Sequence, residues 1–256
     1  MKRILTALLL APAAAALVLW APPWAFHSAA GLIALLSYWE YSRLVERHGV
    51  APPGPVGYAA GLLLLLAPAE IAWWLVSLLA LLALTLALRV RPLAGALPRA
   101  AALLLGVVYI FGAWRSGLAL RELDRWWLLF ALAVNWVGDT AAYYAGRWFG
   151  RRKLAPEISP AKTWAGAVAS AAAALVFGWA YARALWPSMN LPRVLMIAAA
   201  CNLAGQVGDL AESALKRGAG VKDSGALFPG HGGCLDRTDS PLFTMPVLYG
   251  LLRWLG

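Results

Sequence analysis

The sequence is poor in the residues on which soluble and secreted proteins depend. Only 13% of its 256 residues are charged, whereas 62% are hydrophobic, and the mean hydropathy is +0.68. Soluble globular domains carry about twice this charged fraction, so that class is excluded. Two cysteines are too few for a disulfide framework. Acids are scarce too, at 12 against 22 Lys and Arg, and the net charge of +10 favours anionic partners such as phosphates and lipid headgroups.

Apolar segments of helical length recur along the whole chain, separated by polar or proline-marked breaks. They lie at 4–20, 25–44, 55–67, 71–88, 99–116, 126–145, 163–184, 191–212 and 240–255. Because they continue far beyond the first twenty residues, a removable signal peptide explains the N-terminus poorly. We predict an all-α integral membrane protein, a polytopic bundle of about nine transmembrane helices. It forms a single membrane domain, with N-terminal spans in 1–120 and a C-terminal catalytic region in 121–256.

The distribution of Lys and Arg predicts the orientation in the membrane. With the N-terminus in the cytosol, 16 of the 22 cations fall on the cytoplasmic side, in accord with the positive-inside rule. The polar loops 146–162 and 213–239 then face the cytosol, where nucleotides are, and contribute to a polar cavity open to it. No basic patch on a soluble domain is evident, so nucleic acid is not expected as a partner.

The longest polar run, from Ser213 to Ser240, interrupts the apolar pattern. It contains three aspartates, four Lys or Arg and, between Gly218 and Gly233, six glycines. Glycines let backbone N–H groups approach a ligand closely. Lys and Arg donate to phosphate oxygens, and paired aspartates can hold Mg²⁺. This combination predicts a site for a metal-bound phosphate.

Acids in two apolar spans add to this prediction. Asp139 follows a long apolar run, where an unpaired carboxylate is costly, so it is either functional or merely caps the helix end. Asp209 and Glu212 are three residues apart and share a helix face, as half of a metal site or as a solvated helix end. Asn202 and Gln206 on the same span favour the functional interpretation.

The segment 146–166 is basic and precedes another helix. Ser159 is predicted to cap that helix, with Pro160 in its first turn. Backbone N–H groups, Lys162 and Thr163 would then lie beside an anion. The alternative is topogenic, with the cations only holding the loop in the cytosol.

The first half of the chain offers little chemistry. Its tryptophans at segment ends are typical of interfacial anchors. Glu40 and Glu70 are expected at the interface, where a carboxylate reaches water. His27 and His48 are isolated, which is typical of satisfied surface or core residues. We predict no functional residue here.

Three blocks within about 135–245 carry a more specific signal. One contains Ser213, Leu215, Lys216, Arg217, Lys222, Asp223, Gly225, Pro229, His231, Gly232, Gly233, Asp236, Arg237 and Asp239. The second contains Asp139, Ala142, Tyr143, Gly146, Arg147, Gly150, Ser159, Pro160, Lys162, Thr163, Trp164 and Gly166, and the third is the sequence GDLAES. Together these blocks resemble the phosphatidate cytidylyltransferases, also called CDP-diacylglycerol synthases. Cys234 departs from that pattern, since the family usually has an aliphatic residue there, and Ala165 stands where many members have Glu.

The resemblance implies transfer of a cytidylyl group from CTP to phosphatidic acid, giving CDP-diacylglycerol and pyrophosphate in a Mg²⁺-dependent reaction. A second cation such as K⁺ and a homodimer are further expectations. The enzyme would lie in the bacterial inner membrane with its active site facing the cytosol. Phosphatidic acid would enter from the inner leaflet and CTP from the cytosol.

Roles follow from the resemblance and from the residue chemistry. We hypothesise that Asp209 and Asp236 hold Mg²⁺ or a pair of cations, with Asp139, Asp223 and Asp239 as secondary ligands or orienting groups. His231 is expected to position substrate rather than act as a base, because a lipid phosphate needs no deprotonation. The predicted catalytic set is Asp209, Asp236, Lys222, Asp223, His231 and Arg237. The predicted substrate-binding set is Ser159, Lys162, Thr163, Ser213, Lys216, Arg217, Gly232, Gly233, Asp139 and Asp239.

Two alternatives remain open from the sequence. A related enzyme could use CTP on another lipid phosphate or alcohol. A transporter of an anionic solute would also place acids in spans and cations in loops, although no repeat relates the two halves.

Overall fold

The computed structural model describes residues 2–227 and 232–255, which divide into two compact units. Unit 1 comprises Met1–Ala7, Pro22–Leu118 and Leu215–Thr238. Unit 2 comprises Leu8–Ala21, Ala119–Ala214 and Asp239–Gly256. The two units alternate along the sequence. Unit 1 therefore includes the last part of α9 (Leu191–Gly218) and the first turn of α10 (Leu235–Leu255), and the remainder of each helix belongs to unit 2.

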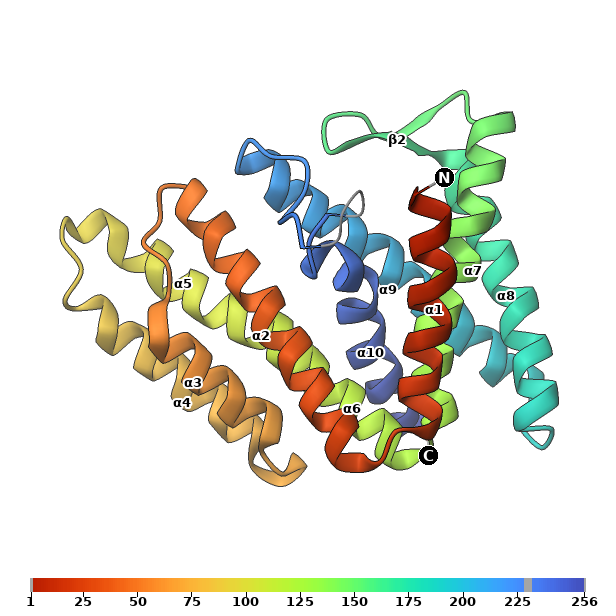
Figure 1. The fold of residues 1–256 in the computed structure, drawn as a ribbon, viewed down its shortest axis with the longest axis horizontal. Coiled ribbons are helices and arrows are strands. Elements are labelled where there is room, and N and C mark those ends of the chain that lie inside the picture. The colour runs from red at the N-terminus through yellow and green to blue at the C-terminus, as the bar shows by residue number, and fades with distance from the viewer. Residues whose placement is uncertain (1, 228–231, 256) are drawn as a thin grey trace. The chain divides into compact units, whose positions relative to one another are not determined.

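Helices account for most of the described chain (Figure 1). The long ones are α1 (Lys2–Trp20), α2 (Pro23–Arg47), α3 (Gly54–Leu66), α4 (Ala69–Ala87), α7 (Arg125–Phe149), α8 (Trp164–Leu185), α9 (Leu191–Gly218) and α10 (Leu235–Leu255). Between α4 and α7 a short 3-10 turn, η1 (Leu93–Gly95), leads into α5 (Ala96–Gly106), the π-helical η2 (Val107–Gly112) and α6 (Ala113–Leu123).

Each apolar range predicted to be helical lies in helical structure, with ends that differ by several residues, and the range 99–116 falls across α5, η2 and α6. Within the residues that the structure describes, four stretches are long and apolar enough to cross a membrane, namely Glu70–Ala87, Leu93–Leu123, Trp164–Leu185 and Leu191–Gly218. The protein is therefore an all-α membrane protein in its main architecture, and the total of nine crossings stays a prediction.

The two polar loops are shorter than predicted. α9 runs on to Gly218 and α10 begins at Leu235, so the polar run is helical at both ends. In the other loop, β1 (Lys153–Ala155) and β2 (Ser159–Thr163) pair antiparallel. This hairpin lies almost wholly within the predicted polar loop, and its backbone groups pair across the turn at 156–158.

The core of unit 1 forms where α2, α3, α5 and η2 pack together. Tyr38 of α2 and Phe111 of η2 are completely buried, with ring centroids 5.3 Å apart. Glycines let the helices approach: a Cβ on Gly57 would strike the Tyr38 ring, and one on Gly61 the Phe111 ring. The contact of α3 with α2 and η2 thus consists of aromatic rings that pack directly on the backbone of glycine residues.

Unit 2 is organised by the long contact between α7 and α8. Asp124 caps α7, since its Oδ1 accepts from Trp126 N at 3.0 Å, and its Oδ2 accepts from Trp186 Nε1 at 3.2 Å. Polar bonds also link these helices to α9 and α10. Asn202 Nδ2 donates to Ser170 Oγ at 2.9 Å, and Asn135 Nδ2 donates to Thr244 Oγ1 at 3.1 Å.

We expect Gly61→Ala to destabilise the protein, because the added methyl group would overlap the buried Phe111 ring. Overpacking of this kind costs about 1–3 kcal/mol. Gly31→Ala is the matched control, since a Cβ there meets nothing nearer than Leu65 Cδ2 at 3.9 Å. Alanine is more favourable than glycine in a helix by about 1 kcal/mol, so this variant should not be destabilised. Thermal unfolding in detergent checks both. Equal melting temperatures for the two variants would contradict the packing argument.

Candidate active site

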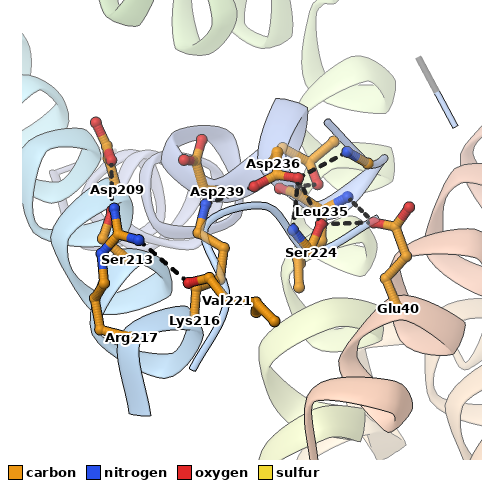
Figure 2. Close-up of polar contacts among 12 residues, drawn as sticks. Glu40, Asp209, Ser213, Lys216, Arg217, Val221, Ser224, Leu235, Asp236 and Asp239 are labelled. Carbon is orange, nitrogen blue, oxygen red and sulfur yellow. Dashed lines mark hydrogen bonds and ion pairs between the residues drawn. The ribbon is translucent and has the colours of Figure 1, made fainter. Parts of the chain in front are cut away.

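Asp236 accepts hydrogen bonds from several groups of the protein. It lies in the first turn of α10, ahead of the apolar part of that helix, with its side chain 4% exposed. Its Oδ1 accepts from Lys216 Nζ at 2.5 Å. Its Oδ2 accepts from the backbone N–H groups of Ser224 and Gly233, at 2.8 and 2.7 Å, and lies 2.8 Å from Ser224 Oγ (Figure 2). The end of α9, the loop at Ser224 and the residue Gly233 just before α10 therefore converge on one carboxylate.

These contacts determine the charge of Asp236. Burial by itself would raise the pKa of its carboxyl group. The hydrogen bond and the positive charge of Lys216, with the bonds from Gly233 and Ser224, outweigh burial, so the pKa lies below its ordinary value. The carboxylate is therefore ionised at neutral pH, as a cation ligand must be.

Gly232 and Gly233 bring the backbone close to this carboxylate. Gly232 has φ +78°, which favours glycine, and a Cβ there would lie 2.5 Å from Asp236 Oδ2. Gly233 donates its own N–H to the same oxygen. The predicted role of these glycines, close approach of backbone N–H groups, thus operates on a protein carboxylate.

A second buried carboxylate, that of Glu40, lies in the same cluster. Glu40 Oε1 accepts from Cys234 N at 2.9 Å, and Oε2 accepts from Leu235 N at 2.8 Å. Ser224 Oγ lies 2.9 Å from Oε2. The prediction that Glu40 reaches water at the interface was wrong, since the residue is 1% exposed. Its signal was only a single acid in an apolar helix, with no spacing that links it to a loop some 190 residues away.

The other predicted residues of unit 1 are more exposed. Lys222, Asp223 and Arg237 are exposed to solvent. Arg217 Nη1 donates to Val221 O at 3.2 Å, which ties the end of α9 to the following loop. His231 lies outside the described residues.

In unit 2 Asp209 is held by the β-hairpin. Lys162 Nζ of β2 lies 2.7 Å from Asp209 Oδ2, and the two side chains are 24% and 33% exposed. Ser213 Oγ donates to Asp209 Oδ1 at 3.4 Å, one turn along α9. Lys162 is thus paired with a carboxylate of the protein itself, and its place beside a bound phosphate stays a prediction.

The predicted cap of α8 was misplaced by one turn. Ser159 and Pro160 lie in β2 rather than at a helix start. The cap is Thr163, whose Oγ1 accepts from Gly166 N at 3.1 Å. Pairing with β1 holds residues 159–163 extended, which delays the helix until Trp164. Thr163 is therefore committed to a structural bond.

The two remaining aspartates of the substrate-binding set belong to unit 2. Asp139 is exposed on α7. Asp239 Oδ1 accepts from Ser240 N at 2.7 Å. Further back on α9, Gln206 Nε2 donates to Asn202 Oδ1 at 2.7 Å, so the predicted polar face of this helix forms a bonded row.

A magnesium site fits the donor chemistry at each predicted ligand. Asp209 and Asp236 each present one oxygen to a lysine ammonium, and oxygen of an ionised carboxylate is the donor that Mg²⁺ prefers. In residues 2–227 and 232–255, no group of three or more His, Cys, Asp and Glu side chains gathers. Asp236 belongs to unit 1 and Asp209 to unit 2.

Comparison with known proteins identifies the family. A family model described as "Cytidylyltransferase family" matches residues 1–255. The chain belongs to this family. It is 34% identical over 229 residues to a phosphatidate cytidylyltransferase of Staphylococcus aureus (strain COL), covering 87% of this chain and 88% of that protein.

Other relatives match over a shorter region. Phosphatidate cytidylyltransferases of Bacillus subtilis (strain 168) and Staphylococcus haemolyticus (strain JCSC1435) are 43% and 39% identical over 153 residues. These matches cover 58% and 60% of this chain, and the chain spans 56% and 59% of the two proteins. The resemblance of the polar blocks to the cytidylyltransferases is thus confirmed at the level of the family.

We expect Lys216→Met to destabilise the protein by about 3–5 kcal/mol at neutral pH, because it leaves the Asp236 carboxylate buried without its cation. In the wild type the pKa of Asp236 is lowered, so its stabilising contribution is lost only as pH falls below about 3.9. In the variant, burial dominates and raises the pKa, so proton uptake restores stability as pH falls.

Thermal unfolding without divalent cations, from pH 7.5 to 5, checks this. The melting-temperature gap between wild type and Lys216→Met should narrow toward pH 5. Lys222→Met, at an exposed lysine, is the control and should show little change. A gap that is constant over this pH range would contradict the assignment.

Proposed function

We propose that this protein transfers the cytidylyl group of CTP to phosphatidic acid. The observation that carries the proposal is the similarity to the Staphylococcus aureus phosphatidate cytidylyltransferase over 87% of this chain and 88% of that protein. The polar clusters around Asp209 and Asp236 lend support, because they pair carboxylates with lysines in the blocks that resemble this family. The enzyme would be a nucleotidyltransferase of phospholipid synthesis.

The reaction needs no activated side-chain nucleophile. A phosphate oxygen of phosphatidic acid attacks the α-phosphorus of CTP, and the bond from that phosphorus to the oxygen bridging to the β-phosphate breaks, releasing pyrophosphate. The protein's task is to neutralise the phosphates and align the two reactants. Lys162, Lys216, Arg217 and the exposed Arg237 are suited to the first task, because charged side chains of this kind donate strong hydrogen bonds to phosphate oxygens.

Mg²⁺ is the cation that Asp209 and Asp236 would hold, and it would neutralise charge on the triphosphate and on the leaving pyrophosphate. The lysine contacts support this, because an ammonium lies at one oxygen of each carboxylate and so marks that oxygen as a position that attracts a cation. On Asp236 the other oxygen is engaged by two backbone N–H groups, so Oδ1 is the oxygen suited to a cation. A second cation such as K⁺ is part of the same proposal.

The setting follows from the membrane character of the chain. We place the enzyme in the bacterial inner membrane, with its polar loops in the cytosol, CTP arriving from that side and phosphatidic acid from the inner leaflet. The excess of Lys and Arg in the predicted cytoplasmic segments supports this orientation. A homodimer belongs to the proposal, whereas a nucleic-acid partner does not.

The activity is tested with purified protein in mixed micelles and CTP labelled on the α-phosphate. We expect label in the extracted lipid only when phosphatidic acid and Mg²⁺ are both present, because the transferred phosphorus is the α-phosphorus. A lipid alcohol and another lipid phosphate are the comparison acceptors. Labelling of one of these instead would favour a related enzyme. Solute flux into vesicles without CTP consumption would favour a transporter.

We expect Asp209→Asn and Asp236→Asn each to abolish transfer, since an amide cannot supply the charge that Mg²⁺ requires. Glu157→Gln removes an exposed carboxylate in the turn between β1 and β2 and is the control that should retain activity. Label transfer is compared at equal amounts of protein that elutes as a single peak in size-exclusion chromatography. Substantial turnover by either aspartate variant would remove that residue from the proposed metal site.

A further inference from the structure

We propose that Glu40 is the positioning residue that holds the start of α10, and through it Asp236, in the geometry needed for cytidylyl transfer. The inference rests on the proposed function for its catalytic consequence. Its structural part, that one carboxylate from α2 anchors the segments 224–225 and 233–235, stands on the contacts of unit 1 alone.

The start of α10 lacks a cap of its own. The three residues before Leu235 are Gly232, Gly233 and Cys234, which carry no side-chain oxygen to accept from the first N–H groups of the helix. Glu40 supplies both of its oxygens instead, one to Cys234 N and one to Leu235 N. A carboxylate at this end of a helix is also favoured by the helix dipole.

Glu40 is linked to Asp236 through Ser224. The Ser224 hydroxyl lies 2.9 Å from Glu40 Oε2 and 2.8 Å from Asp236 Oδ2, and its single proton can be donated to either oxygen. The Ser224 N–H donates to Asp236. Glu40 therefore fixes the helix turn that bears Asp236 and also the loop residue that contacts it (Figure 2).

Two glycines of the polar run are explained by this carboxylate. A Cβ on Gly225 would lie 2.5 Å from Glu40 Oε1, 2.9 Å from its Cδ and 3.3 Å from its Cγ, and these are its three nearest atoms. A Cβ on Gly233 would overlap the carboxylate group of Glu40. Both segments can reach Glu40 only because they lack a side chain at these positions.

Glutamine cannot replace Glu40, although it has the same shape. Both oxygens of the carboxylate accept from backbone N–H groups, whereas an amide offers one acceptor and one NH₂ donor. In Glu40→Gln a donor would face a donor, and one buried N–H would lose its acceptor. Glu46→Gln, at an exposed position of the same helix, is the matched control.

Alkylation of the two cysteines by a maleimide, followed by peptide mass spectrometry, separates local release from general unfolding. Cys234 is 3% exposed and donates its N–H to Glu40, whereas Cys201 is completely buried in α9, in unit 2. In Glu40→Gln we expect Cys234 to react about tenfold faster, because local opening becomes easier, with the rate of Cys201 unchanged. Unaltered labelling of Cys234, or an equal rise at both cysteines, would overturn the proposal.

The same variants are then assayed for transfer. We expect Glu40→Gln to lower kcat about tenfold or more, with KM for CTP changed less than about twofold. Glu46→Gln should match the wild type. A larger KM with unchanged kcat would overturn the positioning role. If the wild type itself transfers no label to any lipid phosphate, the proposed function fails, while the cysteine labelling still decides whether Glu40 anchors the helix.

A double substitution provides the second test, which also covers poor folding of Glu40→Gln. Gly225→Ala alone should lower activity about tenfold, since its methyl group would strike Glu40. In Glu40→Ala all three of the atoms nearest to that methyl group are gone, so Glu40→Ala/Gly225→Ala should be no less active than Glu40→Ala. Multiplicative losses from the two substitutions would show that they act independently and would overturn the proposal.

Discussion

The polar cluster of unit 1 around Glu40 and Asp236 depends on one kind of interaction, the hydrogen bond from a backbone N–H group to a buried carboxylate. Four such groups, from Ser224, Gly233, Cys234 and Leu235, are satisfied by Asp236 and Glu40. An ionised carboxylate is expensive to bury unless its oxygens accept several hydrogen bonds. The Gly-rich sequence meets this requirement, because it lets the chain turn its N–H groups inward at close range. Removing either acid would therefore remove a negative charge and would also free the backbone segment whose N–H groups that acid binds.

Lysine partners complete the electrostatics of the two predicted metal ligands. Lys216 neutralises Asp236 in unit 1, and Lys162 neutralises Asp209 in unit 2. The first pair is buried, so it favours a single arrangement and resists solvent screening. The second is partly exposed and joins a hairpin to a helix, so it contributes less to stability and is easier to exchange for other charges. This difference suits Asp236 to holding one position, and it suits Lys162 to leaving Asp209 for another anion.

The sequence was sufficient for the long apolar helices and for the polar run, and insufficient for short elements and for contacts between distant segments. Apolar length predicted the helices, and clustering of Gly, Asp and Lys between 213 and 240 marked the polar cluster of unit 1. The hairpin at 153–163 was missed because its strands are three and five residues long, too short for a periodic signal. Glu40 was assigned to the interface because an acid in an apolar span gives no sign of its partner. Only the fold shows that the start of α10, without a cap of its own, is completed by another helix.

Reliance on the main chain explains which positions of the polar run tolerate change. Glu40 binds the N–H of residue 234 and not its side chain, so cysteine can stand where the family usually has an aliphatic residue without disturbing the bond. The Cys234 side chain is buried, and its Sγ lies 3.5 Å from Ser37 Oγ and 3.6 Å from Ile33 O. At Gly225 and Gly233 the carboxylate itself fills the space that a side chain would need. The constraint on this run therefore comes from a residue of α2, nearly two hundred positions away, and it acts on glycine positions more strongly than on the charged residues around them.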